Sequence, residues 1–359
     1  MKKYNFLITP LGGRNAGTEA FTSLLLTDLY KKIVATDITR FSYGNHVCDI
    51  FYVQPYASSD GYIKAIESIV KKEEIDVIIP GSDYELRALL KHKQVFDALK
   101  VSILMNSAEV IELCMDKEKT TDFLKKNDFP YIKTESFFPA EASSSSLFSS
   151  LRRKLKCPFV VKPKYFSGGS NSISIIQDTA DWNKFIKLNS DGEMEFIAQE
   201  YIDAPKGEFT VGVMSDTYGK IISSFALKRD LSSSASIKLR VKNKYQKKSR
   251  NDDLIISSGI SQGIVRNFKS IRNFAEKVAA KLKSVGPVNI QCREDNKKIY
   301  IFEINPRFSG TTSIRAILGH NDVELIFYSI VKKVNLGQQK YKLASVVRGR
   351  DVIYKEVKS

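Results

Sequence analysis

Near the C-terminus, residues 286–293 and 298–307 form two strand-like runs that are separated by a short polar turn. A three-residue loop at 295–297 would join them as an antiparallel hairpin in which Gln291 lies opposite Ile301. Because side chains alternate between faces with a period of two, this register decides which face every residue of the hairpin occupies. The hairpin is therefore the most constrained element that the sequence offers.

One face of this hairpin carries side chains of the kinds that bind metal ions and phosphate. Glu303, Asn305 and Arg307 are spaced two apart and should point together, and the register places Gln291 on the same face. Three oxygen ligands suit Mg²⁺, which keeps water molecules and takes further ligands from phosphates, and an arginine can bind the same phosphates. The pattern predicts a Mg·nucleotide site, and the alternative is an ordinary edge hairpin with a polar outer face.

The chain is long and apolar enough for two or three packed domains, with 359 residues of which 43% are hydrophobic. Its four cysteines are far apart and form no Cys-x-x-Cys pair, which favours reduced thiols and a cytoplasmic location. The N-terminal apolar stretch ends at Thr9-Pro10, so we interpret it as a strand and not as a signal peptide. No run approaches the roughly 20 apolar residues of a membrane helix, and we expect no membrane insertion.

Positive charge is concentrated in one segment. The formal net charge is +16, and residues 228–250 contain nine Lys or Arg residues but a single acid. Such a run is commonly a solvated loop. One alternative is a lid over the ligands, with Arg229, Lys238 and Arg240 as its contacts, and another is a nucleic-acid patch. Tyr245 is the single aromatic residue of the run, which argues against a platform for nucleic acid.

The first hundred residues alternate between strand-like and helical segments, which predicts a parallel sheet of βαβ units. The expected strands are residues 4–9, 33–36, 75–79 and 101–104. Asp83 and Glu85 follow the third strand, where residues face the binding crevice of such sheets, so both are candidates for holding a substrate amine or an arginine of the next domain. The alternative for Asp83 is a helix cap. A helix is expected next, over residues 108–126.

The middle of the chain shows features of nucleotide binding. Lys162 ends a strand and precedes a Gly/Ser-rich turn at residues 165–172, whose N–H groups could enclose phosphate oxygens, although a plain hairpin turn is the alternative. Backbone groups of residues 200–202 could bind an adenine edge, and Glu208 could accept hydrogen bonds from ribose. The alternative is that these acids are surface charges at strand ends.

Together these motifs resemble the ATP-grasp superfamily, most closely its carbamoyl-phosphate-synthase-like branch. Residues 115–120, Met-Asp-Lys-Glu-Lys-Thr, match its phosphate-contacting segment, and residues 162–170 match its [KR]-P-x-x-x-x-G-G-S loop. Residues 303–307, Glu-Ile-Asn-Pro-Arg, match its E-x-N-P-R signature, with Gln291 in the first metal position. The resemblance extends from the first strand to about Tyr328.

The resemblance implies an α/β fold with a Rossmann-like parallel-sheet domain before a two-lobed α+β ATP-grasp domain with antiparallel sheets. The implied boundaries are 1–107 for the first domain, 108–198 for the N-terminal lobe, and 199–359 for the C-terminal lobe with the metal site.

The implied activity is the joining of a small-molecule carboxylate and an amine through an acyl phosphate, with release of ADP and phosphate. ATP and Mg²⁺ would be required, with Mn²⁺ as the alternative ion. Gln291, Glu303 and Asn305 would hold the metal, and Arg307 would neutralise charge on the transferred phosphoryl group. The implied nucleotide-binding residues are Lys117, Lys162, Ser167, Gly168, Gly169, Glu200, Tyr201, Ile202 and Glu208.

Two departures from the family narrow the choice. Residues 308–311, Phe-Ser-Gly-Thr, lack the Q-V-E-H continuation of biotin carboxylases, and the chain holds one unit where a carbamoyl phosphate synthase large subunit holds two. We therefore expect a stand-alone carboxylate–amine ligase. The alternatives are an ATP-binding sensor or scaffold without turnover and a nucleic-acid-binding protein. The sequence leaves open the identity of both substrates and whether the protein forms a homodimer.

Overall fold

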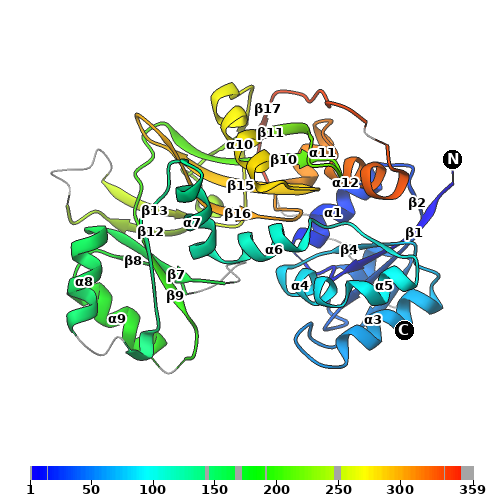
Figure 1. The fold of residues 1–359 in the computed structure, drawn as a ribbon, viewed down its shortest axis with the longest axis horizontal. Coiled ribbons are helices and arrows are strands. Elements are labelled where there is room, and N and C mark those ends of the chain that lie inside the picture. Colours follow the sequence, from blue (N-terminus) through cyan, green and yellow to red (C-terminus); the bar gives the residue numbers. More distant parts are fainter. Residues whose placement is uncertain are drawn as a thin grey trace, which may run out of the picture.

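Three sheets and a two-stranded arm build the molecule. In Figure 1 a parallel sheet lies at the lower right, a four-stranded sheet at the lower left, and a six-stranded sheet across the top. The computed structural model describes residues 2–13, 15–141, 145–165, 172–190, 192–245, 252–334 and 336–348.

The N-terminal sheet is parallel and has the strand order β3-β2-β1-β4-β5. Its strands are β1 (Tyr4–Thr9), β2 (Tyr30–Asp37), β3 (Ile50–Val53), β4 (Val77–Pro80) and β5 (Ser102–Ile103). β1 is buried along its whole length, as expected for the central strand of a sheet that is covered on both faces. The expected parallel sheet is confirmed. The sequence prediction lacked β3, a short and half-exposed edge strand.

Helices cover both faces of this sheet. They are α1 (Ala16–Leu25), α2 (Gly44–Val47), α3 (Tyr62–Lys72), α4 (Asp83–Lys91) and α5 (Lys93–Ala98). The core on one face joins the sheet to residues of α3, α4 and α5. On the other face α1 packs beside α12 (Asp322–Phe327), and the Phe327 ring lies 5.1 Å from that of Tyr4. The two ends of the chain therefore share one core.

The helix expected over residues 108–126 is in fact two helices, α6 (Ala108–Met115) and α7 (Lys117–Lys126). Asp116 separates them with an extended backbone (φ −101°, ψ 114°), and its carboxylate accepts hydrogen bonds from two N–H groups of the first turn of α7. This cap starts a new helix. It places Lys117 at the first position of α7.

The four-stranded sheet is antiparallel, with the order β6-β9-β7-β8. Its elements are β6 (Thr134–Phe137), the 3₁₀ turn η1 (Pro139–Glu141), α8 (Ser145–Leu155), β7 (Phe159–Pro163), β8 (Ser174–Ile176), α9 (Thr179–Asn189) and β9 (Phe196–Glu200). Trp182 of α9 packs on Phe148 of α8 in the core of this lobe. The domain boundaries remain predictions. We propose to place the second boundary after β9, because a division at 198/199 would cut this strand.

The six-stranded sheet has the order β16-β15-β10-β11-β14-β17 and is also antiparallel. Its strands are β10 (Gly207–Ser215), β11 (Ile221–Arg229), β14 (Gly263–Val265), β15 (Pro287–Glu294), β16 (Ile299–Asn305) and β17 (Ala344–Val346). Helix α10 (Lys269–Leu282) packs on β10 and β11 and is the uppermost helix in Figure 1. The antiparallel sheets confirm the expected fold class.

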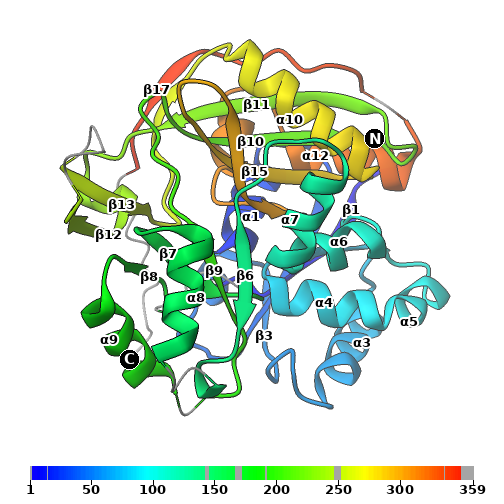
Figure 2. The same cartoon turned by 60° about the vertical axis from the view of Figure 1, so that its left-hand side comes forward.

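A two-stranded arm lies between the six-stranded and the four-stranded sheets (Figure 2). It consists of η2 (Ser234–Ser236), β12 (Ile237–Lys242) and β13 (Asp253–Ser257), and we call residues 232–245 and 252–258 the arm. The remaining elements, α11 (Thr312–Ile317), α12 and the π-helix η3 (Tyr328–Lys332), follow β16. Within the described ranges, no helix has the length and apolar character needed to cross a membrane. All four cysteines are free.

A buried polar cluster fixes α11 and α12 against the six-stranded sheet. Arg315 forms a two-pronged ion pair with Asp322, whose other oxygen lies 3.1 Å from His320 Nδ1, and His320 Nε2 contacts the hydroxyl of Ser223. At Gly212 of β10, an added Cβ would lie 2.6 Å from Arg315 Cζ, so glycine leaves room for the guanidinium. This Ser-His-Asp arrangement does not line the large cavity described below, and we assign it a structural role.

We predict that Asp322→Asn lowers the free energy of unfolding by about 3–5 kcal/mol, because Arg315 keeps a buried charge without a counter-ion. Urea titration followed by circular dichroism measures this loss. Ser223→Ala serves as the matched variant and should cost only about 1–3 kcal/mol, since it removes a neutral partner. Equal losses in the two variants would contradict a special role for the ion pair.

Candidate active site

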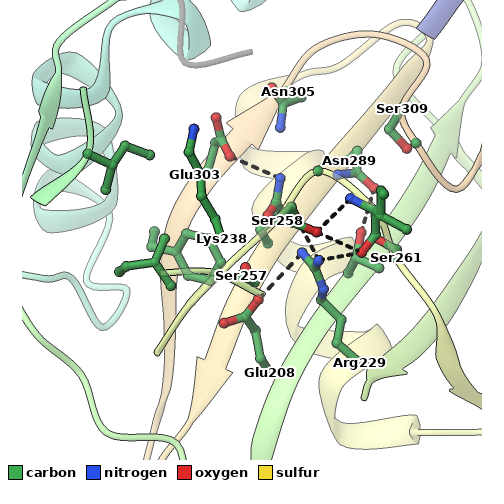
Figure 3. Close-up of a pocket in the computed structure, with 18 of the residues that line it drawn as sticks. Glu208, Arg229, Lys238, Ser257, Ser258, Ser261, Asn289, Glu303, Asn305 and Ser309 are labelled. Atoms are coloured by element: carbon green, nitrogen blue, oxygen red, sulfur yellow. Dashed lines mark hydrogen bonds and ion pairs between the residues drawn. The ribbon is translucent and has the colours of Figure 1, made fainter. Parts of the chain in front are cut away.

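A cavity of about 810 Å³ lies between the three sheets and the arm. Its walls come from β7 and β9 of the four-stranded sheet, from β10, β15 and β16 of the six-stranded sheet, from the arm, and from the N-terminal ends of α1, α4 and α7. Figure 3 shows the part of it that faces β15 and β16. Most of the residues predicted to form a site meet here.

The β15–β16 ladder holds the predicted metal ligands, in a register that differs from the expected one. Gln291 pairs with Glu303, not with Ile301, and its Nε2 donates to a Glu303 carboxylate oxygen at 2.9 Å. The turn is one residue longer than expected, and a β-bulge at Phe302 then shifts the register by one more residue. A shift of one residue moves a side chain to the opposite face of the strand, and a second shift moves it back. The predicted face is therefore correct, although the predicted pairing was wrong.

This ligand set has the chemistry of a magnesium site completed by a ligand. Gln291, Glu303 and Asn305 line the cavity with oxygen donors, of which one is a carboxylate. Among the described residues, no group of three His, Cys, Asp or Glu side chains could hold a metal ion by itself. An oxygen set with few protein charges fits Mg²⁺ or Mn²⁺ that takes its other ligands from phosphates and water.

Two buried lysines face this ladder. Lys162 donates to the carbonyl of the bulged residue Phe302 at 3.0 Å, and Lys117 donates to the carbonyl of Lys164 at 3.2 Å. Both side chains are almost fully buried. Burial, together with the charge of Lys117, lowers the pKa of Lys162 to about 7, and burial also lowers the pKa of Lys117. Two ammonium groups in such an environment form a site for a polyanion.

Arg307 and Asp83 form an ion pair across the molecule. The guanidinium of Arg307 binds the Asp83 carboxylate with two hydrogen bonds, of 2.5 and 2.9 Å. Burial acts to raise the pKa of Asp83, but the charge and the hydrogen bonds of Arg307, together with the charge of Lys117, outweigh burial and lower it. Of the three roles considered for Asp83, namely holding a substrate amine, holding an arginine and capping a helix, the structure shows the contact with an arginine. The helix cap is the neighbouring Ser82.

At the far end of β9, the predicted adenine-binding residues line the cavity. Arg293, which the sequence prediction missed, donates to the Ile202 carbonyl at 3.0 Å and to Glu208 at 2.9 Å. Its guanidinium lies 5.1 Å from the Tyr201 ring centroid. Arg229 also lies 3.5 Å from Glu208. Two guanidinium groups therefore already occupy Glu208, the residue predicted to bind ribose.

Three more predicted residues differ in their placement. Lys238 of β12 extends into the cavity toward Glu303 (Figure 3). Glu85 does not line the cavity. Its carboxylate accepts from the hydroxyl of the helix cap Ser82, and burial raises its pKa. Arg240 also lies outside the cavity wall, exposed and 3.5 Å from Asp253. The predicted contacts Ser167, Gly168 and Gly169 lie outside the described residues.

Several lining residues had no place in the sequence prediction: Asn15, Glu19, Tyr84, Asn289, Arg293, Ser309 and Arg348. Asn289 pairs with Asn305 and continues the polar face of the ladder. The alternation used for Gln291 could have found it, since the two residues are spaced two apart. No local pattern marks Glu19 or Arg348, which come from opposite ends of the chain.

Comparisons with known proteins agree with this architecture. Residues 6–104 match the family model of the PylC-like N-terminal domain, and residues 247–354 match a model described as ATP-grasp in the biosynthetic pathway with Ter operon. The carbamoyl phosphate synthase large chain of Thermoplasma acidophilum is 21% identical over 317 residues, which cover 83% of this chain and 27% of that relative. The chain thus spans about a quarter of that relative's length.

Solved structures share the fold at low sequence identity. N5-carboxyaminoimidazole synthetase from Staphylococcus aureus, complexed with ADP, superposes with a TM-score of 0.68 and 16% identity over 95% of this chain and 81% of that chain. L-amino acid ligase from Bacillus licheniformis gives a TM-score of 0.61 and 16% identity over 92% and 75% of the two chains. The chain therefore has the ATP-grasp fold, and its sequence is similar to an ATP-grasp family model and to carbamoyl phosphate synthase large chains.

Proposed function

We propose that the protein is an ATP-dependent carboxylate–amine ligase that works through an acyl phosphate and releases ADP and phosphate. The observation that carries the proposal is the meeting of two buried lysines, Lys117 and Lys162, with the oxygen ladder of Gln291, Glu303 and Asn305 in one cavity. Cations on one wall and metal-type oxygens on the other are what a nucleoside triphosphate with Mg²⁺ requires.

The nucleotide would lie along the cavity from β9 to β16. Backbone groups of Glu200 to Ile202 would bind the adenine edge, next to the aliphatic lining residues Val160 and Ile173. Lys117 and Lys162 would hold the α- and β-phosphates. Mg²⁺, when bound, would neutralise the transferred phosphoryl group and orient it. For ribose, Glu200 at the same strand end is a second candidate beside Glu208.

The chemistry needs no covalent enzyme intermediate. A carboxylate oxygen of the substrate attacks the terminal phosphorus, and the bond from this phosphorus to the bridging oxygen of ADP breaks. An amine nitrogen then attacks the acyl carbon, phosphate leaves, and the nitrogen loses a proton. Arg307, held in place by Asp83, would stabilise negative charge on the phosphoryl oxygens. The fixed guanidinium needs little reorganisation during the reaction.

We also propose that the arm is a lid over the nucleotide. Its base is fixed by Arg229, which donates to the carbonyls of Ser258 and Ile260 at 2.7 and 2.9 Å. Its outer end is held by Gln177, whose side chain accepts from Lys244 N and donates to the Lys242 carbonyl. The arm thus bridges both sheets and covers the cavity between them, which would exclude water from an acyl phosphate.

Charge pairing within the arm does not favour the nucleic-acid alternative. Lys242 and Arg240 both lie near Asp253, and Lys244 pairs with Asp178 and Asp181 of the neighbouring lobe. The basic run is thus partly neutralised by the protein itself. Cytoplasmic location and a homodimer remain predictions.

We predict that Glu303→Ala abolishes ligation, lowering kcat by about a hundredfold or more, because the carboxylate of the metal set is lost. Coupled assays of ADP and phosphate, run over paired panels of carboxylates and amines, measure this. Asp253→Asn, on the exposed side of the arm, is the matched control and should keep its activity. ADP release that persists in Glu303→Ala would contradict the metal assignment, and nucleotide binding without turnover on any pair would favour the sensor.

We predict that ADP affinity falls as pH rises above about 7, because Lys162 has a pKa of about 7 in the free protein and a phosphate beside it raises that pKa. Below this range the ammonium is charged in both states and contributes no pH dependence. Above it, binding takes up a proton, so the dissociation constant grows by up to about tenfold per pH unit. Calorimetry between pH 6 and 9 measures the slope, and Lys162→Met should flatten it. Identical slopes in both proteins would refute the assignment.

Arg229, Lys238 and Arg240 were all expected to be lid contacts, but we predict that their substitutions have different effects. Lys238→Gln should lower kcat/KM for ligation by about tenfold or more at unchanged melting temperature, since it faces the cavity. Arg229→Gln should lower the melting temperature, because Glu208 loses one of its two charged partners. Arg240→Gln, exposed on the same arm, is the control and should leave both quantities unchanged. Steady-state kinetics and thermal unfolding test these outcomes.

A further inference from the structure

Two ionised side chains that the proposed reaction does not yet use meet in the cavity wall. Glu19 lies in the first turn of α1, and Arg348 follows β17 near the other end of the chain. The guanidinium binds both Glu19 oxygens, at 2.6 and 2.7 Å. Both residues line the cavity, so a ligand that enters this end would meet the ion pair.

This ion pair is set close to the reacting end of the cavity. Arg348 Nη2 also donates to the carbonyl of Gly310 at 2.5 Å, and Gly310 stands three residues after Arg307. The hydroxyl of Ser313 is a second donor to Glu19. The pair is thereby tied to the segment that carries Arg307.

The opposite charges of Glu19 and Arg348 favour one class of ligand at this end of the cavity. Glu19 is only 7% exposed, so a carboxylate displaced from Arg348 by a simple anion would remain buried without a counter-charge. A simple amine that captured Glu19 would leave Arg348 without its partner. A ligand that carries both charges can supply a new partner to each side chain. In an α-amino acid the ammonium and the carboxylate are joined through a single carbon, which suits two side chains that lie in direct contact.

We propose that Glu19 and Arg348 bind the amine substrate, and that this substrate is an α-amino acid or a peptide with a similar end. The inference rests on the proposed ligase function. Arg348 binds the α-carboxylate of the acceptor and Glu19 its amino group. The bound ammonium first gives one proton to Glu19, which passes it to solvent, so that the nitrogen has a lone pair. The nitrogen then attacks the acyl carbon, the bond from this carbon to the phosphate oxygen breaks, and the leaving phosphate takes the second proton.

The first test is binding to the full chain saturated with Mg·ADP, measured by calorimetry with the twenty common α-amino acids and, for each ligand that binds, its decarboxylated amine and its N-acetyl derivative. We expect at least one amino acid to bind about tenfold or more tightly than both analogues, because each analogue lacks one of the two charges. Arg348→Gln should remove the discrimination against the amine. Glu19→Gln should remove that against the N-acetyl derivative.

A second measurement separates recognition from a purely structural bridge. Lys32→Gln is the matched control, since it breaks an ion pair of 2.9 Å with Glu73 in the same domain but outside the cavity wall. We expect Arg348→Gln to raise the KM of the amino acid while the KM of ATP changes no more than in Lys32→Gln. A lower melting temperature with an unchanged amino-acid KM would overturn the proposal and leave a structural bridge. No amino-acid binding, or equal binding of the analogues, would also overturn it.

Failure of the ligase function itself would look different. In that case no pair of substrates would support ADP release, whether or not the protein binds Mg·ATP. ADP release that is supported equally well by amines without a carboxylate would keep the ligase and refute the amino-acid site.

Discussion

The β-bulge at Phe302 is the constraint on which the rest of the site depends. It turns the register of β15 and β16 so that Gln291 and Glu303 lie side by side, and it presents the Phe302 carbonyl to Lys162 of the four-stranded sheet. One irregularity thus builds the oxygen ladder and connects it to the opposite wall. Bulges commonly re-aim side chains next to binding sites. Without the bulge, the Phe302 carbonyl would not be presented to Lys162, and the ladder would lose this hydrogen bond to the four-stranded sheet.

The buried arginines and the buried lysines around this ladder differ in their partners, and this difference supports the proposed function. Arginines at the cavity are matched by acids, as in the pairs Arg307 with Asp83 and Arg348 with Glu19. Lys117 and Lys162 instead donate to backbone carbonyls, and burial lowers the pKa of both. Such buried groups lower the stability of a protein. A polyanionic ligand would restore the balance, which explains why an unmatched cationic wall can be retained.

Local rules predicted much of the fold and of the site, and they failed where tertiary context competes with them. The alternation of strand-like and helical segments predicted the parallel sheet, and the two-residue period predicted the ligand face of the hairpin, because both patterns are local. Glu85 was grouped with Asp83 as a crevice acid, but its carboxylate turns to the hydroxyl of Ser82, three residues before it. The helix expected over 108–126 was broken by Asp116, whose side chain competes locally for helix N–H groups. The basic run contained one residue that faces the cavity, Lys238, and one that faces solvent, Arg240.

By itself the sequence indicated the chemistry that we propose, because the oxygen ligands, the lysines and the two-residue period all lie in short segments. It also determined that the chain is built from a parallel sheet followed by antiparallel sheets. Only the tertiary structure decided which charges are matched, since Glu19 and Arg348 or Asp83 and Arg307 are brought together by the packing of α1 and α4 against segments that follow β16. For Asp83 the strand end indicated a candidate for holding an arginine but not which arginine. For Glu19 and Arg348 no local pattern exists, because their contact depends on the core that α1 shares with α12 and not on the spacing of residues.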